Sequence, residues 1–246
     1  MKQGLVLDKV VLLGRTFDEY VRYFALDPDV LGGQAILDVA AGVSSFCAEA
    51  AQRGLNTTAL DLIYERSLEE IEARCQPDLD HVLNAIRGLS TYRWGFYQSP
   101  DRLRGYRERA YQTFLADYRA HRGSRYQSGK LPHLPFRDRQ FDLTLVSYLL
   151  FVYEDQLDYA FHKQSLLEIM RVTRGEARLY PLVSFEARRC CHLDALKSDP
   201  DLRHLRLEEV PTDFEFLANS NSFLKVQHAA SPEEIAPGKV GWGCGL

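Results

Sequence analysis

The segment with the clearest chemical character runs from residue 37 to residue 46. An acidic residue stands in an apolar run and small residues follow it, in the order Leu37, Asp38, Val39, Ala40, Ala41, Gly42, Val43, Ser44, Ser45, Phe46. Small residues let the backbone approach a ligand closely, and a helix that starts there offers unpaired N–H groups. A carboxylate beside this turn would repel a pyrophosphate but attract an ammonium group. Asp38 therefore favours a cationic nucleoside that carries an amino acid over a dinucleotide.

A second acidic residue, Asp61, follows the next apolar run, 19 residues after Gly42. A carboxylate at that point can accept hydrogen bonds from a ribose diol. Taken alone, Asp61 would be read as an ordinary surface acid, and its position relative to the turn gives it meaning.

These residues need a particular frame to meet. Residues 35–39 are predicted to form a buried strand, residues 45–53 a helix that ends at Gly54, and residues 57–60 a second strand. Strand, turn, helix and strand make a βαβ unit, which predicts a parallel sheet with a right-handed crossover.

The alternation of strands and helices resumes later in the chain. We predict a strand over 141–147, a helix over 154–172 and a strand over 177–183. Two late strands, within 205–217 and 223–227, are joined by the turn-rich residues between them and are predicted to form an antiparallel hairpin.

Taken together, the motifs resemble those of the class I S-adenosylmethionine-dependent methyltransferases. The resemblance covers most of residues 30–228 and is carried by Ile36–Gly42, Asp61, Leu134-Pro135-Phe136, Phe141–Ser147 and Glu168–Leu182. It implies an α/β, Rossmann-like, doubly wound sheet of seven mostly parallel strands, with an antiparallel last strand and a helical insertion. It also implies S-adenosylmethionine as the cofactor and methyl transfer as the activity.

The resemblance assigns cofactor roles by position. Asp38 would lie near the methionyl amino group, Asp61 would bind the ribose hydroxyls, and Leu131 would flank the adenine. The turn and the methionyl side would be formed by Ala40, Ala41, Gly42, Ser45 and Ser147. Two departures stand out, because Ser44-Ser45 replaces the usual glycines and Lys130 stands where relatives carry an acid near the adenine amine.

The acceptor side is less determined. Methyl transfer is an in-line displacement in which the protein mainly orients the reactants and excludes water, so no universal catalytic residue exists to search for. Tyr148, Tyr153 and His162 are the candidates. The Asn-Pro-Pro-Tyr motif of many DNA amino-methylating enzymes is absent, which argues against methylation of a nucleobase amine. The first hypothesis is a small-molecule acceptor.

Residues 64–128 read as a helical cap inserted into one methyltransferase-like domain that spans residues 1–230, with a flexible tail over 231–246. Within the cap, Ser99-Pro100 predicts the start of a helix. Residues 87–125 contain nine arginines and three acids, a local excess of +6, which leaves about −10 on the rest of the chain. Arginines interleaved with aromatic residues can bind phosphates and bases. An RNA- or protein-directed methyltransferase and a non-catalytic cofactor-binding module therefore stay open as alternatives. A NAD-dependent oxidoreductase is weaker, because the turn lacks Gly-x-Gly-x-x-Gly.

The composition sets broad limits. With 30 basic and 34 acidic residues the net charge is −4, which disfavours a generally basic nucleic-acid binder. No run is long enough to span a membrane, and the start of the chain lacks an export signal. Five cysteines without metal-type spacing, the adjacent Cys190-Cys191-His192 included, predict no metal site and a cytoplasmic location. The oligomeric state is left open.

Overall fold

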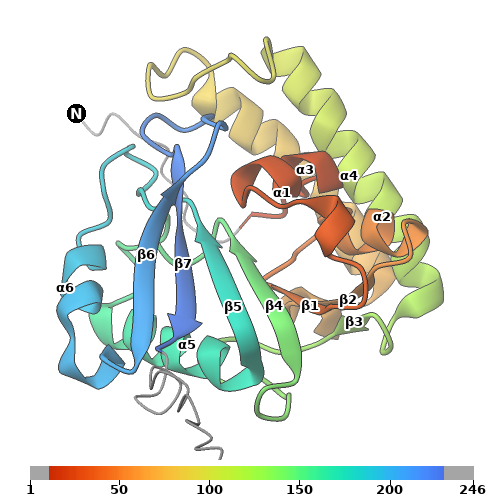
Figure 1. Cartoon of the computed structure of the whole chain (residues 1–246). Coiled ribbons are helices and arrows are strands. Elements are labelled where there is room, and N and C mark those ends of the chain that lie inside the picture. Colours follow the sequence, from red (N-terminus) through yellow and green to blue (C-terminus); the bar gives the residue numbers. More distant parts are fainter. Residues whose placement is uncertain (1–10, 230–246) are drawn as a thin grey trace, which may run out of the picture.

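The computed structural model describes residues 11–229, and within this range seven strands form one sheet (Figure 1). The order across the sheet is β3-β2-β1-β4-β5-β7-β6. β1 to β5 run parallel, whereas β7 is antiparallel to both of its neighbours. The expected doubly wound sheet with an antiparallel last strand is confirmed. The strands are β1 Ala35–Val39, β2 Asn56–Leu60, β3 Tyr126–Gln127, β4 Phe141–Ser147, β5 Thr173–Tyr180, β6 Leu205–Pro211 and β7 Ser222–His228.

Helices cover both faces of the sheet (Figure 1). Alternate residues of β1 point to opposite faces, so Ile36 packs with α1 to α4 while Leu37 and Val39 pack in the core that contains α5 and α6. The helices are α1 Phe17–Tyr23, α2 Phe46–Gln52, α3 Leu68–Ile86, α4 Pro100–His121, α5 Tyr159–Val172 and α6 Leu193–Ser198, with 3₁₀ turns at Pro28–Val30, Leu62–Glu65 and Pro200–Leu202.

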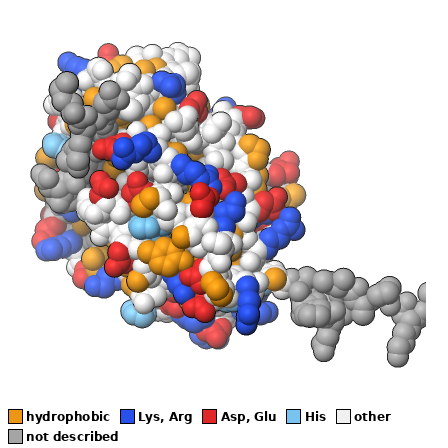
Figure 2. Space-filling view, turned by 90° about the vertical axis from the view of Figure 1, so that its left-hand side faces the viewer, with side chains coloured by type: hydrophobic (Ala, Val, Ile, Leu, Met, Phe, Trp, Pro, Cys, Tyr) orange, Lys and Arg blue, Asp and Glu red, His pale blue; other side chains and the backbone are white. Residues whose placement is uncertain are grey.

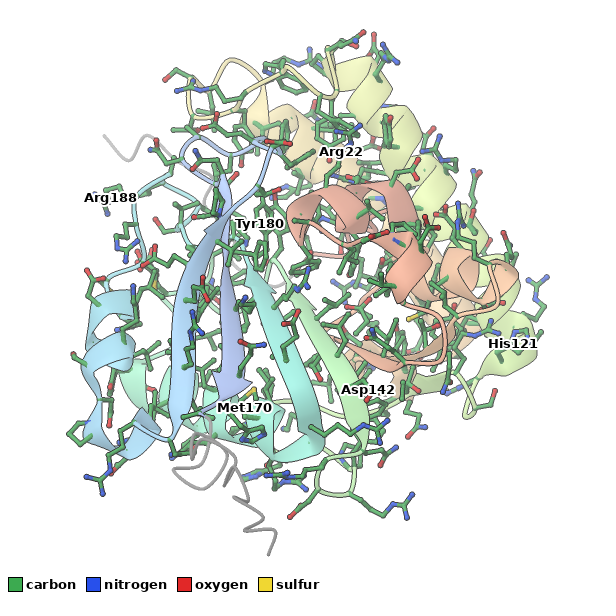
Figure 3. All side chains as sticks on the ribbon, in the orientation of Figure 1. Arg22, His121, Asp142, Met170, Tyr180 and Arg188 are labelled. Atoms are coloured by element: carbon green, nitrogen blue, oxygen red, sulfur yellow. The ribbon has the colours of Figure 1, made fainter. Side chains whose placement is uncertain are left out.

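The two ends of the sheet differ in character. At the amino end, Asp142 accepts a hydrogen bond from the Ala35 amide at 2.8 Å and pairs with Arg174. Figure 3 shows Asp142 and Met170 at this lower end, and Tyr180 at the upper end of β5. The carboxyl ends of the parallel strands therefore lie at the upper end, where the loops that could carry chemistry meet.

The outer strand β6 is protected by charge. Glu209 accepts hydrogen bonds from Arg189 and Lys197 at 2.7 Å, and these donors lower the pKa of Glu209 to about 2. Acidic and basic side chains are interspersed over the face seen in Figure 2, which is turned toward this edge of the molecule. Such charges discourage an edge strand from pairing with another chain.

Three boundaries differ from the sequence prediction. α5 begins at Tyr159 rather than at residue 154, because the Asp158 side chain caps it by accepting the Phe161 amide at 2.8 Å. β5 occupies 173–180 rather than 177–183, because it starts without a loop where Thr173 aligns with Phe141 of β4. β6 ends at residue 211, well before 217.

The segment predicted to be a helical cap contains the long helices α3 and α4, which pack on each other (Figure 1). α4 begins as the sequence indicates, with Ser99 as the capping residue and Pro100 in the first turn. The last residues of this segment are not helical: Tyr126 and Gln127 pair with Ala59 and Leu60 as β3. A two-residue strand carries too little periodicity to be recognised in the sequence. The tail predicted over 231–246 lies outside the described residues.

Candidate functional site

A cavity of about 450 Å³ opens at the carboxyl ends of β1, β2 and β4. In the sheet order, β2 and β4 flank β1 on opposite sides, so the chain leaves β1 at the point where the strand order reverses. Open α/β sheets bind their ligands in the crevice at such a switch point. The volume is in the range of roughly 300–1,000 Å³ that small-molecule sites occupy.

The turn after β1 forms one wall of this cavity. Ala40 and Gly42 both have left-handed backbones, with φ of 57° and 55°. For alanine this conformation costs about 1–2 kcal/mol, and it shows where a tight turn is held against strain. The amide of Ala41 donates to the carbonyl of Leu60 at 3.2 Å, which joins the turn to the end of β2.

Asp61 completes this junction. Its carboxylate accepts the amide of Gly42 at 2.9 Å and the amide of Ile63 at 2.8 Å. Burial raises the pKa of Asp61, while these two backbone donors oppose that shift. A carboxylate has about four lone-pair positions, so Asp61 keeps acceptors for a ligand in the cavity. The structure thus brings together the two motifs that the sequence places 19 residues apart.

Asp38 lies behind the cavity wall. Its side chain is fully buried and does not line the cavity, because it points to the face of the sheet that α1 covers. The Tyr20 hydroxyl donates to both carboxylate oxygens, at 3.1 and 3.0 Å, and Tyr20 does line the cavity. Burial raises the pKa of Asp38 well above its ordinary value, although the Tyr20 hydroxyl lowers it. Tyr20 is therefore the residue that links the Asp38 carboxylate to the cavity by a hydrogen bond.

The remaining residues of the predicted cofactor site divide in two groups. Ser45 is buried away from the cavity, where its hydroxyl donates to Glu49 at 2.5 Å and its amide donates to the Arg15 carbonyl at 2.9 Å. The residues that do line the cavity are Ala40, Ala41, Gly42, Asp61, Leu131 and Ser147. Their roles toward a cofactor remain predictions.

The three catalytic candidates also separate. Tyr148, which has a left-handed backbone with φ of 54°, and Tyr153 both line the cavity. Burial raises the pKa of each phenol, so both are neutral hydroxyls near pH 7. His162 is fully buried elsewhere, and its ring nitrogens face the carbonyls of Asp158 and Leu150 at 2.8 and 3.0 Å. Because His162 does not line the cavity, the geometry does not support it as a base.

One hydroxyl in the cavity lacks a partner. Ser147 is 8% exposed, and its Oγ is buried without a hydrogen bond to any described residue. A buried polar atom left unpaired costs free energy. The end of β4 therefore holds an unpaired hydroxyl in the wall of the cavity.

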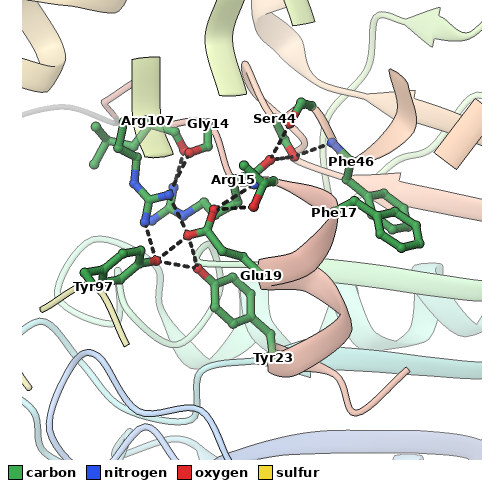
Figure 4. Close-up of polar contacts among 12 residues, drawn as sticks. Gly14, Arg15, Phe17, Glu19, Tyr23, Ser44, Phe46, Tyr97 and Arg107 are labelled. Atoms are coloured by element: carbon green, nitrogen blue, oxygen red, sulfur yellow. Dashed lines mark hydrogen bonds and ion pairs between the residues drawn. The ribbon is translucent and has the colours of Figure 1, made fainter. Parts of the chain in front are cut away.

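The sequence did not identify the segment before α1 as part of the site. Val11, Leu12, Leu13 and Arg15 line the cavity, and the Arg15 carbonyl accepts the Ser44 hydroxyl at 2.8 Å (Figure 4). A Cβ on Gly14 would lie 2.2 Å from the Val43 carbonyl oxygen, so only glycine permits this approach. A glycine two residues before the helix cap Thr16 was the available signal, but it did not show which loop it would contact.

One arginine and several aromatic rings of the arginine-rich segment belong to the core, whereas six of its nine arginines are exposed. Arg107 of α4 is buried and pairs with Glu19 of α1 at 2.6 Å, while Tyr97 bonds both of them (Figure 4). Phe114 and Tyr118 are fully buried in the core of the same face. These aromatic rings are therefore not available to stack on nucleotide bases.

The structure assigns the fold of the chain, and comparison with known proteins assigns its family. The strand order, the antiparallel β7 and the cavity at the switch point define the Rossmann-like fold of the class I S-adenosylmethionine-dependent methyltransferases. The chain is 38% identical over 225 residues to the uncharacterized protein MJ0045 of Methanocaldococcus jannaschii, which covers 91% of this chain and 98% of that protein. The chain belongs to the same family as that protein. No family model matches the chain.

Solved structures give weaker likenesses. A putative S-adenosyl-L-methionine-dependent methyltransferase from Methanococcus maripaludis is 12% identical, with a TM-score of 0.40 over 88% of this chain and 85% of that one. Magnesium protoporphyrin IX methyltransferase from Synechocystis, solved with bound S-adenosylmethionine, is 11% identical, with a TM-score of 0.44 over 87% and 78%. The fold assignment rests on the sheet order itself.

Proposed function

We propose that this protein transfers a methyl group from S-adenosylmethionine to a small-molecule acceptor. The observation that carries the proposal is the bond between the Gly42 amide and Asp61, which joins the small-residue turn and the acidic strand end at one cavity. The structural neighbours that are named as methyltransferases support the same activity.

The residues present fit this cofactor. Asp61 has acceptors to spare for ribose hydroxyls, and Leu62 and Leu131 offer apolar contact to a purine. The Tyr20 hydroxyl, whose proton is directed to Asp38, leaves lone pairs that can accept from an ammonium group. The unpaired Oγ of Ser147 lies at the β4 side, where the methionyl part would reach.

The chemistry required of the chain is modest. When bound, S-adenosylmethionine supplies a methyl carbon on a positively charged sulfur. The described residues on the β4 side of the cavity include no histidine or cysteine, and Tyr148 and Tyr153 are neutral. We infer that the acceptor carries its nucleophilic lone pair at neutral pH, so that the protein orients it and excludes water without removing a proton.

Features outside the cavity bear on the class of methyl acceptor and on the location of the protein in the cell. Four of the eight aromatic residues of the arginine-rich segment are buried and the other four pack against the same core, so no observation favours RNA as the acceptor. Within residues 11–229, no helix combines the length and apolar character needed to cross a bilayer. Cys47, Cys75, Cys190 and Cys191 are free thiols, which supports our proposal of a reducing, cytoplasmic location.

Calorimetric titration with S-adenosylmethionine and S-adenosylhomocysteine tests the function. We expect both to bind, and Asp61→Asn to weaken each roughly tenfold or more, because a buried charge-assisted hydrogen bond contributes about 1.5–3 kcal/mol. Glu72→Gln, an exposed acid of α3, is the control for the same loss of charge. If the wild-type protein binds neither compound, the proposal is wrong. If both compounds bind but no methyl group is transferred to any member of a panel of small molecules, the result favours the alternative of a non-catalytic cofactor-binding module.

A further inference from the structure

Arg15 is a cation at the cavity that no acid within residues 11–229 balances. Its guanidinium lines the cavity wall, and no described carboxylate lies within ion-pair distance of it. Of its five N–H donors, Nη1 donates to the Leu13 carbonyl, and Nε is buried without a partner. Partly buried guanidinium groups are normally paired, because leaving the charge unpaired is unfavourable. The geometry of Arg15 therefore calls for an anion that residues 11–229 do not supply.

The surroundings of Arg15 are flat and apolar. Its guanidinium carbon lies 4.2 Å from the centre of the Tyr148 ring. Phe185 meets Tyr153 edge-on at 5.0 Å between ring centres, and both line the same cavity. A planar group can lie along these rings while it presents an oxyanion to the guanidinium fork.

The cavity also extends behind Arg15. A second, smaller cavity of about 40 Å³ shares Leu13, Arg15, Tyr148 and Phe185 with the first. Its other walls are almost all apolar or aromatic, among them Leu79, Val82, Leu83, Ile86, Leu103 and Phe216. Such a space favours a ring edge or a short hydrocarbon group over water.

The charges around the opening are partly balanced. The cavity lining holds four cationic side chains, Arg15, Arg66, Arg74 and Lys130, and two acidic ones, Asp61 and Glu65. Arg66 pairs with Glu70 at 3.6 Å, and Arg74 pairs with Asp78 at 2.8 Å. An anion that enters the cavity would therefore meet Arg15 and Lys130, the two cations of this lining that have no carboxylate partner among the described residues.

We propose, on the basis of the function proposed above, that the methyl acceptor is a small oxyanion on a flat apolar body, a carboxylate or a phosphate ester, which Arg15 binds and Tyr148, Tyr153 and Phe185 hold. Arg15 is then the residue that determines acceptor specificity. The planar fork of Arg15 matches either oxyanion, and the two are separated by the choice of probe.

The test uses the full chain saturated with S-adenosylhomocysteine and three probes: benzoate, phenyl phosphate and the neutral benzamide. We expect at least one of the two oxyanions to bind, and benzamide to bind roughly tenfold more weakly or worse, because a charge-assisted pair contributes about 1.5–3 kcal/mol. Arg15→Met should abolish the preference for the oxyanion, and Arg15→Lys should restore part of it.

Arg109→Met is the matched control. The guanidinium of Arg109 also lies over a tyrosine ring, 4.7 Å from the centre of Tyr106, but it lies outside the cavity. Its loss should leave probe binding unchanged within about twofold, because it changes the charge by the same amount and removes a similar ring contact.

Three results would overturn the proposal. The first is that neither oxyanion binds the loaded protein, and the second is that benzamide binds as well as benzoate. The third is that Arg15→Met weakens S-adenosylhomocysteine but not 5′-methylthioadenosine, which lacks the amino-acid carboxylate. Arg15 would then bind the cofactor carboxylate. If the wild-type protein binds no S-adenosylhomocysteine at all, the proposed function fails first, and the probes are titrated against the unloaded chain to judge Arg15 separately.

Discussion

The Asp38 carboxylate faces α1 and not the cavity, because side chains along β1 alternate between the two faces of the sheet. The Tyr20 hydroxyl fills the space between Asp38 and the cavity and donates to both carboxylate oxygens. With its proton directed inward, this hydroxyl acts toward the cavity as an acceptor polarised by a carboxylate. We therefore propose that Tyr20, a residue of α1, takes the role toward an ammonium group that the sequence analysis assigned to Asp38 of β1.

Tyr20→Phe tests this role. It should weaken S-adenosylhomocysteine, which carries an ammonium group, by roughly 3- to 10-fold, the value of one hydrogen bond of about 0.5–1.5 kcal/mol. Binding of 5′-methylthioadenosine, which has no ammonium group, should not change. Calorimetric titration of both compounds gives the comparison, and Tyr153→Phe, on the β4 side, serves as the control. An equal loss for both compounds would show that Tyr20 only supports the fold.

Among the helices, α1 and α4 are joined by the buried ion pair between Glu19 and Arg107. Burial by itself would raise the pKa of Glu19, but the charge of Arg107 and the hydrogen bonds from Tyr97 and Thr16 bring it below its ordinary value of 4.5. Arg107 also donates to the Gly14 carbonyl at 3.1 Å, in the segment that lines the cavity. The pair therefore fixes three separate parts of the chain at one point.

Arg107→Met should destabilise the fold by about 3–5 kcal/mol, because it leaves the Glu19 carboxylate buried without its counter-charge. Adding Glu19→Gln should recover a large part of that loss. Urea unfolding at pH 7 gives both free energies of unfolding. Arg104→Met, which removes a half-exposed ion pair with Asp80, is the control and should cost about 1 kcal/mol or less.

The pH dependence of this pair has a definite sign. Since the pKa of Glu19 is lowered in the folded state, its contribution to stability is complete above pH 4.5 and is lost as the pH falls below that value. The Arg107→Met, Glu19→Gln double variant lacks the titrating group. Its free energy of unfolding should therefore fall less than that of the wild type as the pH is lowered below 4.5. Equal acid sensitivity of wild type and double variant would contradict the argument.

At the scale of the whole molecule, the basic segment and the acidic body form one packed unit. The Leu12 amide, in the residues before α1, donates to Asp78 of α3 at 2.9 Å. At the other end of the inserted helical segment, β3 joins the sheet by pairing with β2. The hydrophobic core on the face of α1 to α4 is shared between these helices and the strands. We therefore propose one domain, and not a cap that folds independently.

Unfolding should then be a single transition. The fluorescence of Trp94, which lies between α3 and α4, reports on the helical segment in a Trp242→Phe background. Far-ultraviolet circular dichroism reports on the whole fold. The two urea midpoints should coincide, and S-adenosylhomocysteine should raise both together. At a hundred times its Kd, the ligand adds about 2.7 kcal/mol to the free energy of unfolding. An earlier fluorescence transition would identify a separate unit.

Local pattern was enough to predict several features. β1 and β4 occupy the predicted residues because apolar runs bounded by turns fix buried strands. α4 starts at its Ser99-Pro100 signal for a similar reason. The pairing of Asp61 with the turn follows from the βαβ unit, which brings the carboxyl ends of neighbouring parallel strands together.

The remaining features depend on contacts between distant residues. β3 exists because β2 offers an open edge to Tyr126 and Gln127, and Ser45 is withdrawn from the site because Glu49 and the Arg15 carbonyl bind it. Arg15 and Tyr20 enter the site because the chain before and within α1 packs on the turn after β1. Sequence periodicity reports which face of an element is buried, but not which neighbour will cover it. The sequence alone therefore determined the frame and placed the turn after β1 beside Asp61. The tertiary structure decided which other residues line the cavity, because it set which neighbour covers each face.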